Sequence, residues 1–389
     1  MRRRGAARYV IIVLVLCLSC FIAYVAIGMA TADTTIDFTV DYIAPSVDYS
    51  GIDFDTASER WAVALNGNTI ANKNGEVVAP TASTAKMIMA LAVMEKKPFD
   101  LGSKGETITI DSDLYARYSW YLSHNGSNSK VELGEEISEY DALAAALVVS
   151  SNNMADGLAI WAFGSLEAYS EYANEMVKRL GATNTNIGVD ASGFDMSTTS
   201  TASDLALIGE AVLKNPVLNE IVNLKEIDIP VAGHLVNTNK ILGKNGLLGI
   251  KTGYIGDESG YCLVSGYKEG EELVTIAMLG APERQNSFDD TEAIIVKAKE
   301  AIKTRELVSE DQQVGHYSSW WIGKAAVTAD NSVSGVAVSE ITADLDVDSR
   351  ELKLNTKETN YSTSVSVAEF AEKPTLKQRF LHVFGWSAE

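Results

Sequence analysis

Hydrophobic residues recur with different spacings along the chain, and these spacings divide it into segments. Residues 9–30 carry no charge, helical spacing dominates the middle, and short alternating runs follow Arg305. Long uncharged runs are typical of membrane-directing segments, whereas alternation with a period of two indicates strands. We expect five segments, in chain order: a signal peptide or membrane anchor (residues 1–32), a spacer (33–49), a mixed domain (50–303), a small β domain (304–374) and an amphipathic tail (375–389).

The first segment joins a basic start to the uncharged run. Four arginines lie among the first eight residues. Because a positive flank stays in the cytoplasm, the rest of the chain is expected to be extracytoplasmic. The small residues at 30–32 favour cleavage before Asp33, but the run is also long enough to remain as an anchor.

The mixed domain begins with a hairpin and a buried helix. Residues 61–65 predict a strand, and Asn66-Gly67-Asn68 a turn into a second strand that runs through Ile70. Residues 87–94 are apolar on every face, which predicts a helix buried on all sides.

Capping residues and later strands complete this domain. Helix starts are expected at Ser138 and Thr201, each followed three residues later by Asp, and a helix end at Gly181. From Leu247 the pattern predicts three strands, at 248–255, 260–267 and 273–279, with a turn at 268–271 between the last two. A helix is expected to follow at 290–302. An early hairpin, a helical middle and a late meander predict an α+β domain whose sheet joins both ends of the segment.

The last two segments are shorter. Alternating runs predict the strands of a small all-β domain, at 325–328, 333–338, 341–347, 352–354 and 363–367. Leu376, Phe380 and Phe384 then follow at helical spacing, with Lys377 and Arg379 nearby. This stripe fits an interfacial helix on a membrane surface or a helix docked on the β domain equally well.

Charge and composition exclude several classes of function. The chain carries a net charge of −20 and has no basic stripe, which argues against a nucleic-acid partner. Its three cysteines provide no disulfide framework, because Cys17 and Cys20 lie in the uncharged run and Cys262 is alone. The four histidines are widely separated, so we expect neither a metal site nor a cofactor. No G-x-S-x-G motif occurs, and the base of any serine hydrolase here would not be histidine.

The first candidate for chemistry is Ser83 with Lys86, at the start of the apolar helix. Residues three apart share a helix face, so the lysine amine can reach the serine hydroxyl. Serine needs a base, and a lysine becomes one when desolvation lowers its pKa. A helix start with an unrelated Ser and Lys would give the same pattern. Ser127 and Lys130 share the spacing but have no apolar helix behind them.

Two further motifs carry polar groups that suit a peptide substrate. Residues 150–153 read Ser-Ser-Asn-Asn, and we choose the pair Ser150/Asn152 because Ser150 continues the core-facing line of the preceding helix. Lys251-Thr252-Gly253 lies on a predicted strand, where a cation and a hydroxyl can hold a carboxylate and Gly253 permits close approach of a ligand. Taken alone, the first motif also fits the polar C-terminus of a helix, and the second fits the exposed end of a strand.

Ser-x-x-Lys, Ser-x-Asn and Lys-Thr-Gly, in this order, resemble the set found in penicillin-binding proteins and class A β-lactamases. Their surroundings, "APTASTAKMIMALAVME", "ALVVSSNNMADGLA", "GLLGIKTGY" and "SGYCLVSGY", resemble the serine D-alanyl-D-alanine carboxypeptidases, the low-molecular-mass penicillin-binding proteins. The resemblance implies their fold: an antiparallel sheet flanked by helices, with a helical subdomain, followed by a small all-β domain.

The resemblance also implies roles for individual residues. Ser83 would attack the penultimate D-Ala carbonyl of a peptidoglycan stem peptide ending in D-Ala-D-Ala, with Lys86 as its base. Ser150 and Lys251 would transfer a proton to the leaving amine, and Asn152 would bind the substrate backbone. Thr252 would bind the substrate carboxylate, and Gly253 would let the ligand approach the strand closely. The N–H groups of Ser83 and Tyr254 would form the oxyanion hole. β-Lactams would be covalent inhibitors, and the membrane surface a further partner.

Departures from the family pattern and alternative functions remain. Ser151, Asn153 and Ile255 replace residues that are usual in the family, which affects the expected substrate preference and deacylation rate. A class A β-lactamase needs a glutamate that residues 215–219 lack. A wall-binding module that has kept the fold without activity is the other alternative.

Overall fold

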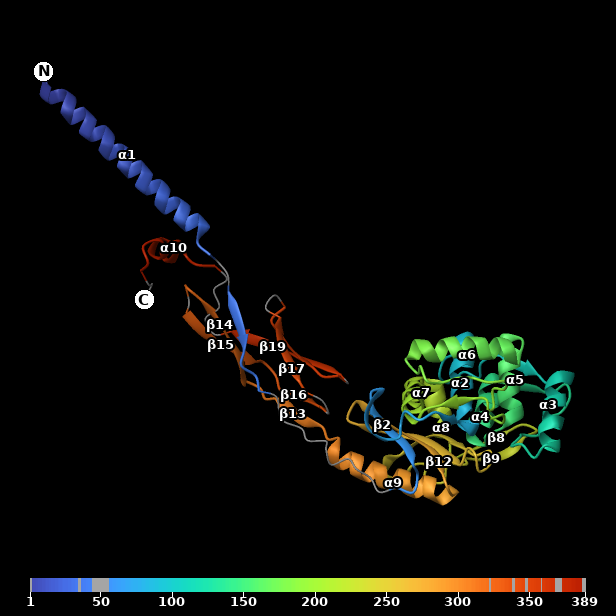
Figure 1. Cartoon of the computed structure of the whole chain (residues 1–389). Helices are drawn as coiled ribbons and strands as arrows, with labels where there is room; N and C mark the ends of the chain where they lie inside the picture. The colour runs from blue at the N-terminus through green and yellow to red at the C-terminus, as the bar shows by residue number, and fades with distance from the viewer. Residues whose placement is uncertain are drawn as a thin grey trace.

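The structure is a computed structural model, and it describes residues 2–33, 36–43, 56–321, 323–337, 340–346, 349–357, 359–367 and 373–386. Figure 1 shows a long N-terminal helix, a β domain beside its end and a larger domain of helices and sheet beyond it.

A five-stranded antiparallel sheet forms the centre of the larger domain, with the strand order β10-β11-β12-β2-β3. Its strands are β2 (Arg60–Leu65), β3 (Asn68–Lys73), β10 (Leu248–Gly253), β11 (Tyr261–Glu269) and β12 (Glu272–Ala281). The pairing of β12 with β2 joins the two ends of the domain, as the sequence predicts. The mixed fold with a later all-β region is therefore confirmed.

Helices cover both faces of this sheet (Figure 1). The alternation of β2 shows why: Trp61, Val63 and Leu65 enter the core beneath α9 (Arg284–Ala301), whereas Ala62 and Ala64 enter the helical core on the other side. A strand buried on both faces is apolar throughout. Helix α9 begins six residues before the predicted 290, because its polar first turns still bury Ser287 and Phe288.

The helical part surrounds one buried helix. Its helices are α2 (Ala85–Lys96), α3 (Ser112–Ser123), α4 (Glu139–Val148), α5 (Asn152–Phe163), α6 (Leu166–Leu180), α7 (Ala202–Lys214) and α8 (Pro216–Val222). Helix α2 is buried on almost every side, as its composition predicts. The caps are also confirmed: Ser138 accepts from Asp141 N, Thr201 accepts from Asp204 N, and Gly181 adopts a left-handed φ of 94°.

Short elements connect these parts. They are the 3₁₀ turns η1 (Ala82–Thr84) and η2 (Lys244–Gly246), and three two-stranded ribbons: β4 (Ala79–Pro80) with β7 (Thr199–Ser200), β5 (Thr107–Thr109) with β6 (Glu136–Ser138), and β8 (Glu226–Ile229) with β9 (Gly233–Val236).

The β domain contains a strand from the beginning of the chain. Its six-stranded sheet has the order β1-β14-β15-β19-β18-β17, and β13 pairs with β16. The strands are β1 (Asp37–Val40), β13 (Arg305–Val308), β14 (Gln313–Ser319), β15 (Gly323–Ala329), β16 (Val333–Gly335), β17 (Thr342–Asp346), β18 (Glu351–Asn355) and β19 (Asn360–Val367). The expected spacer at 33–49 is thus wrong for residues 37–40. This strand has only four residues, and none of them is fully buried, so its sequence shows no clear alternation of hydrophobic and polar positions. Residues 44–49 lie outside the described residues.

The two terminal helices lie together. Helix α1 (Arg2–Thr31) contacts α10 (Leu376–Val383), as Figure 1 shows. The Phe21 and Phe384 rings are 6.0 Å apart, and Arg379 donates to the Met29 carbonyl over 3.2 Å. Helix α10 also contacts the β domain, because Gln378 donates to the Trp321 carbonyl over 2.7 Å. One side of α10 therefore packs against α1 and the β domain.

Candidate active site

A cavity of about 260 Å³ lies where η1, the α4–α5 turn and the edge strand β10 meet. Its lining includes Ser83, Ser150, Thr252, Gly253 and Tyr254, five of the eight residues expected to form the site. The other three, Lys86, Asn152 and Lys251, are buried around it. The fold thus brings three distant parts of the chain together.

Ser83 and Lys86 are in contact, as their spacing predicts. Lys86 is fully buried in α2, and its Nζ lies 2.9 Å from Ser83 Oγ. It also donates to Asn152 Oδ1 and to the Ser192 carbonyl, both over 2.7 Å. Burial lowers the pKa of Lys86 to about 7, although the carboxylates of Asp190 and Asp156 oppose the shift. A neutral amine can accept the serine proton.

The structure distinguishes the two Ser-x-Asn pairs. Asn152 begins α5 and binds Lys86, and Ser150 lines the cavity. In the other pair, Ser151 donates to Asn153 Oδ1, and Asn153 is also bound by the backbone of Ser129. Ser151 and Asn153 therefore stabilise the turn, whereas Lys86 is bound by Asn152 of the first pair.

Helix periodicity is nevertheless the wrong reason for the position of Ser150. Helix α4 ends at Val148, and Ser150 lies beyond it with a left-handed φ of 65°. The backbone of this turn, rather than a helix face, directs Ser150 into the cavity.

Strand β10 forms one wall through the Lys-Thr-Gly motif. Lys251 is 1% exposed and donates to the Thr252 carbonyl over 2.9 Å, and burial, followed by the charge of Lys86, lowers its pKa. The Thr252 and Thr238 hydroxyls lie 2.7 Å apart. A Cβ on Gly253 would lie 3.1 Å from Ser83 N, so a larger residue would crowd the backbone of η1.

Several residues of the cavity were not among the expected site residues. Asn125, Ser127, Thr238, Arg284 and Cys262 also line it. Ser127 belongs to the second Ser-x-x-Lys match, but its Lys130 is bound to Glu132 at 3.1 Å. Burial raises the pKa of the Cys262 thiol to about 11, which keeps it protonated. Asn125, Ser127 and Thr238 lie in loops, whereas Cys262 lies on β11 and Arg284 begins α9, and only the fold brings these positions together.

The sequence of residues 55–283 matches the model of the D-alanyl-D-alanine carboxypeptidase family, Peptidase_S11. The chain belongs to this family. The expected resemblance is thereby confirmed, and the match covers more than half of the chain.

The chain spans about half the length of two curated relatives, DacA and DacF. It is 29% identical over 222 residues to D-alanyl-D-alanine carboxypeptidase DacA of Escherichia coli K12, covering 55% of this chain and 53% of that protein. It is 27% identical over 228 residues to D-alanyl-D-alanine carboxypeptidase DacF of Bacillus subtilis, covering 57% of each.

Solved structures of the same fold extend the comparison. The Streptomyces K15 DD-transpeptidase matches with a TM-score of 0.57 at 22% identity, over 63% of this chain and 97% of that one. Penicillin-Binding Protein D2 from Listeria monocytogenes, in its ampicillin-bound form, matches with a TM-score of 0.53 at 27% identity, over 63% of this chain and 98% of that one.

Proposed function

We propose that this member of the family is a serine-type D-Ala-D-Ala carboxypeptidase that removes the terminal D-alanine from peptidoglycan stem pentapeptides. The observation that carries the proposal is the contact between Ser83 Oγ and the fully buried Nζ of Lys86. A serine next to an amine whose pKa is about 7 has its base in place at neutral pH.

Acylation is the first half of the reaction. Lys86 takes the proton of Ser83 while Oγ bonds to the penultimate D-Ala carbonyl carbon. The N–H groups of Ser83 and Tyr254 would hold the developing oxyanion, a role supported by the close approach of Gly253 to Ser83 N. The C–N bond then breaks, and a proton reaches the D-alanine amine through Ser150 and Lys251. Water attacks the acyl-enzyme, releases the shortened peptide and returns the proton to Ser83.

Substrate binding uses the remaining polar groups. Thr252, bound to Thr238, would hold the terminal carboxylate at the β10 edge, where Arg284 adds a positive charge to the lining. Asn152 would bind the substrate backbone while its Oδ1 holds Lys86 in place. β-Lactams would acylate Ser83 in the same way.

We also propose that the protein works outside the cytoplasmic membrane, held by both termini. Residues Arg8–Thr31 of α1 have a mean hydropathy of 3.1 and are long enough to cross a membrane. The contacts of α10 with Phe21 and Met29 favour retention of α1 as an anchor over its removal. The outer side of α10, where Leu376 is 75% exposed, and Trp386 after it, which is 62% exposed, would lie on the membrane surface.

The decisive experiment is the intact mass of the protein after brief exposure to benzylpenicillin, followed over time, with Ser83→Ala as the control. We expect a persistent gain of one penicillin that is absent from the variant, together with D-alanine release from a peptide ending in D-Ala-D-Ala. Rapid drug hydrolysis without an adduct would support a β-lactamase instead. If the protein forms no adduct and hydrolyses no drug, the result would support a non-catalytic wall-binding module.

A further inference from the structure

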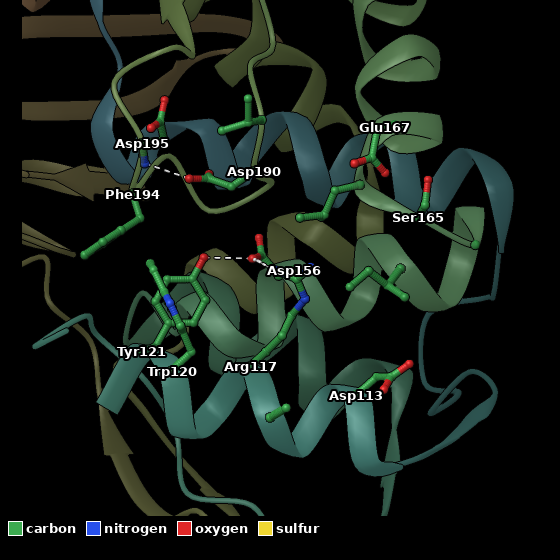
Figure 2. A pocket seen from close by; sticks show the side chains of 15 residues that line it. Asp113, Arg117, Trp120, Tyr121, Asp156, Ser165, Glu167, Asp190, Phe194 and Asp195 are labelled. Atoms are coloured by element: carbon green, nitrogen blue, oxygen red, sulfur yellow. Dashed lines mark hydrogen bonds and ion pairs between the residues drawn. The ribbon is translucent and has the colours of Figure 1, made fainter. Parts of the chain in front are cut away.

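Behind Lys86 lies a buried carboxylate that the proposed mechanism does not use. Asp156, on α5, is fully buried, and it accepts from Arg117 Nη1 at 3.0 Å, Tyr121 OH at 2.7 Å and Ala191 N at 3.0 Å. Figure 2 shows Asp156 between Arg117 and Tyr121, which both extend from α3. A buried charge needs such partners, because an unpaired carboxylate is costly to desolvate.

Asp156 is linked to Lys86 through the segment 190–195. Its bond to Ala191 N fixes the start of this segment, and the next residue, Ser192, supplies the carbonyl that accepts from Lys86 over 2.7 Å. Tyr121 OH, bound to Asp156, also lies 3.2 Å from Ser192 Oγ. A displacement of Asp156 would therefore reach an acceptor of the lysine amine.

A second carboxylate gives the segment its shape. Asp190 accepts from Ser192 N at 2.9 Å, Gly193 N at 2.5 Å and Asp195 N at 2.6 Å. Gly193, with a φ of 67°, packs against the Ala82 carbonyl, where a Cβ would lie only 2.0 Å away. The same segment thus supports both Lys86 and the turn that carries Ser83.

The charges around Lys86 come from several elements. The groups that interact electrostatically with Lys86 or with the two carboxylates are Asp156 on α5, Asp190 in the segment, Lys251 on β10, Arg117 and Tyr121 on α3, and Tyr169 on α6. Both tyrosines are neutral, because burial raises their pKa values. The charges of Asp190 and Asp156 raise the pKa of Lys86 against the effect of burial, and the charge of Lys86 lowers the pKa of Lys251.

We propose that Asp156 is a positioning residue that holds the Ser192 carbonyl against Lys86 and, through its charge, sets the pH at which Lys86 becomes a base. The inference rests on the proposed role of Lys86. Arg117 is the solvent-facing end of this network: its side chain is 37% exposed, and it borders a cavity of about 830 Å³ lined by Trp120, Phe194 and Glu167 among others (Figure 2).

The sign of the effect follows from the charges. Lys86 must lose its proton before it can accept one from Ser83, so acylation rises as pH passes its pKa. A negative charge nearby favours protonated Lys86, and its removal lets the proton leave at lower pH. Asp156→Asn is therefore expected to move the acid limb of the acylation rate to lower pH, by about 0.5 to 1 unit.

The test measures the second-order rate of acylation by a fluorescent penicillin against pH, for the full chain and its variants. Asp156→Asn and Asp156→Ser remove the charge, and Asp156→Glu keeps it. The matched control is Asp204→Asn on α7, since Asp204 also accepts from a loop N–H, that of Asn184 at 2.7 Å, but does not act on Lys86. We expect the acid limb to move only in the two neutral variants.

The outcomes separate this inference from the proposed function. An unshifted acid limb in a folded neutral variant, with only the plateau rate reduced, would overturn it, as would failure of both neutral variants to fold while Asp156→Glu folds. Failure of the wild-type protein to acylate, or acylation of Ser83→Ala, would instead refute the proposed function. A wild-type profile without an acid limb near the pKa of Lys86 would exclude the lysine as base.

Discussion

At the scale of single residues, two strained positions direct the chemistry. Ala82 and Ser150 have φ angles of 47° and 65°, a left-handed conformation that costs about 1 kcal/mol or more in a residue with a Cβ. Ala82 precedes Ser83, and Ser150 faces the same cavity. The sequence predicted which residues meet but not these turns, because neither Ala nor Ser signals a left-handed backbone. At Ala82 this conformation accompanies the packing of η1 against Gly193 and β10.

The pKa of Lys86 gives a prediction at this scale. Acylation by benzylpenicillin should fall about tenfold for each pH unit below about 7, because protonated Lys86 cannot accept the Ser83 proton. Lys86→Gln should lower the plateau rate at least about 10²-fold. Rates of mass gain across pH test both expectations, and unchanged thermal unfolding of the variant is the control. A profile independent of pH on the acid side would contradict the assignment.

Gly253 gives a second prediction. Gly253→Ala should slow acylation by about 10- to 100-fold, because its Cβ would press on the backbone N–H of Ser83 and distort the proposed oxyanion hole. Gly157→Ala is the comparison: that glycine is also buried, but an added Cβ would meet only the end of the Leu114 side chain, at 3.2 Å. Equal rates in the two variants would remove the argument for an oxyanion hole at this position.

At the scale of elements, strong local signals were reliable and weak ones were not. Helix α2 and strands β2, β11 and β12 were predicted because continuous burial makes their sequences apolar. Strands β1 and β14 were missed, since half-exposed strands carry polar residues such as His316, which binds Asp41 at 2.6 Å. Their pairing depends on contacts between distant parts of the chain, which no local window contains.

The pairing of β1 with β14 is testable. Phe38 lies opposite Tyr317, with ring centroids 5.8 Å apart. Phe38→Ala should lower the free energy of unfolding of the β domain by about 1 to 3 kcal/mol, because a half-buried aromatic contact is lost. Its neighbour Thr39, which is exposed, should tolerate alanine within about 0.5 kcal/mol. Urea unfolding followed by tryptophan fluorescence compares the two variants, and equal midpoints would contradict the pairing.

At the scale of the whole molecule, helices α1 and α10 contact each other on the side of the β domain away from the candidate active site (Figure 1). The uncharged run of α1 and the apolar stripe of α10 were visible in the sequence, but their contact was not, because an apolar pattern does not show what covers it. The structure leaves α1 almost wholly exposed outside this contact, as expected for a helix surrounded by lipid.

Retention of α1 is therefore our prediction at this scale. Protein extracted from membranes should have the mass of the uncleaved chain, and it should remain in the membrane fraction at high salt, where charge attraction alone is screened. The Phe384→Ala variant, which loses the ring contact with Phe21, is expected to keep its membrane location but lose protection of α10 from proteolysis. The mass calculated for a chain that begins at Asp33 would contradict retention of α1.

The position of β1 also determines the order in which the chain can fold. Because β1 pairs with β14, the larger domain is an insertion within the β domain, and His316 meets Asp41 across 275 residues of sequence. Strand β1 is synthesised long before its neighbour β14, so the inserted domain is expected to fold before the domain that carries it. A truncated chain that begins at residue 56 would leave β14 as an unpaired edge, open to pairing with another molecule. Soluble versions of this protein should therefore begin before β1.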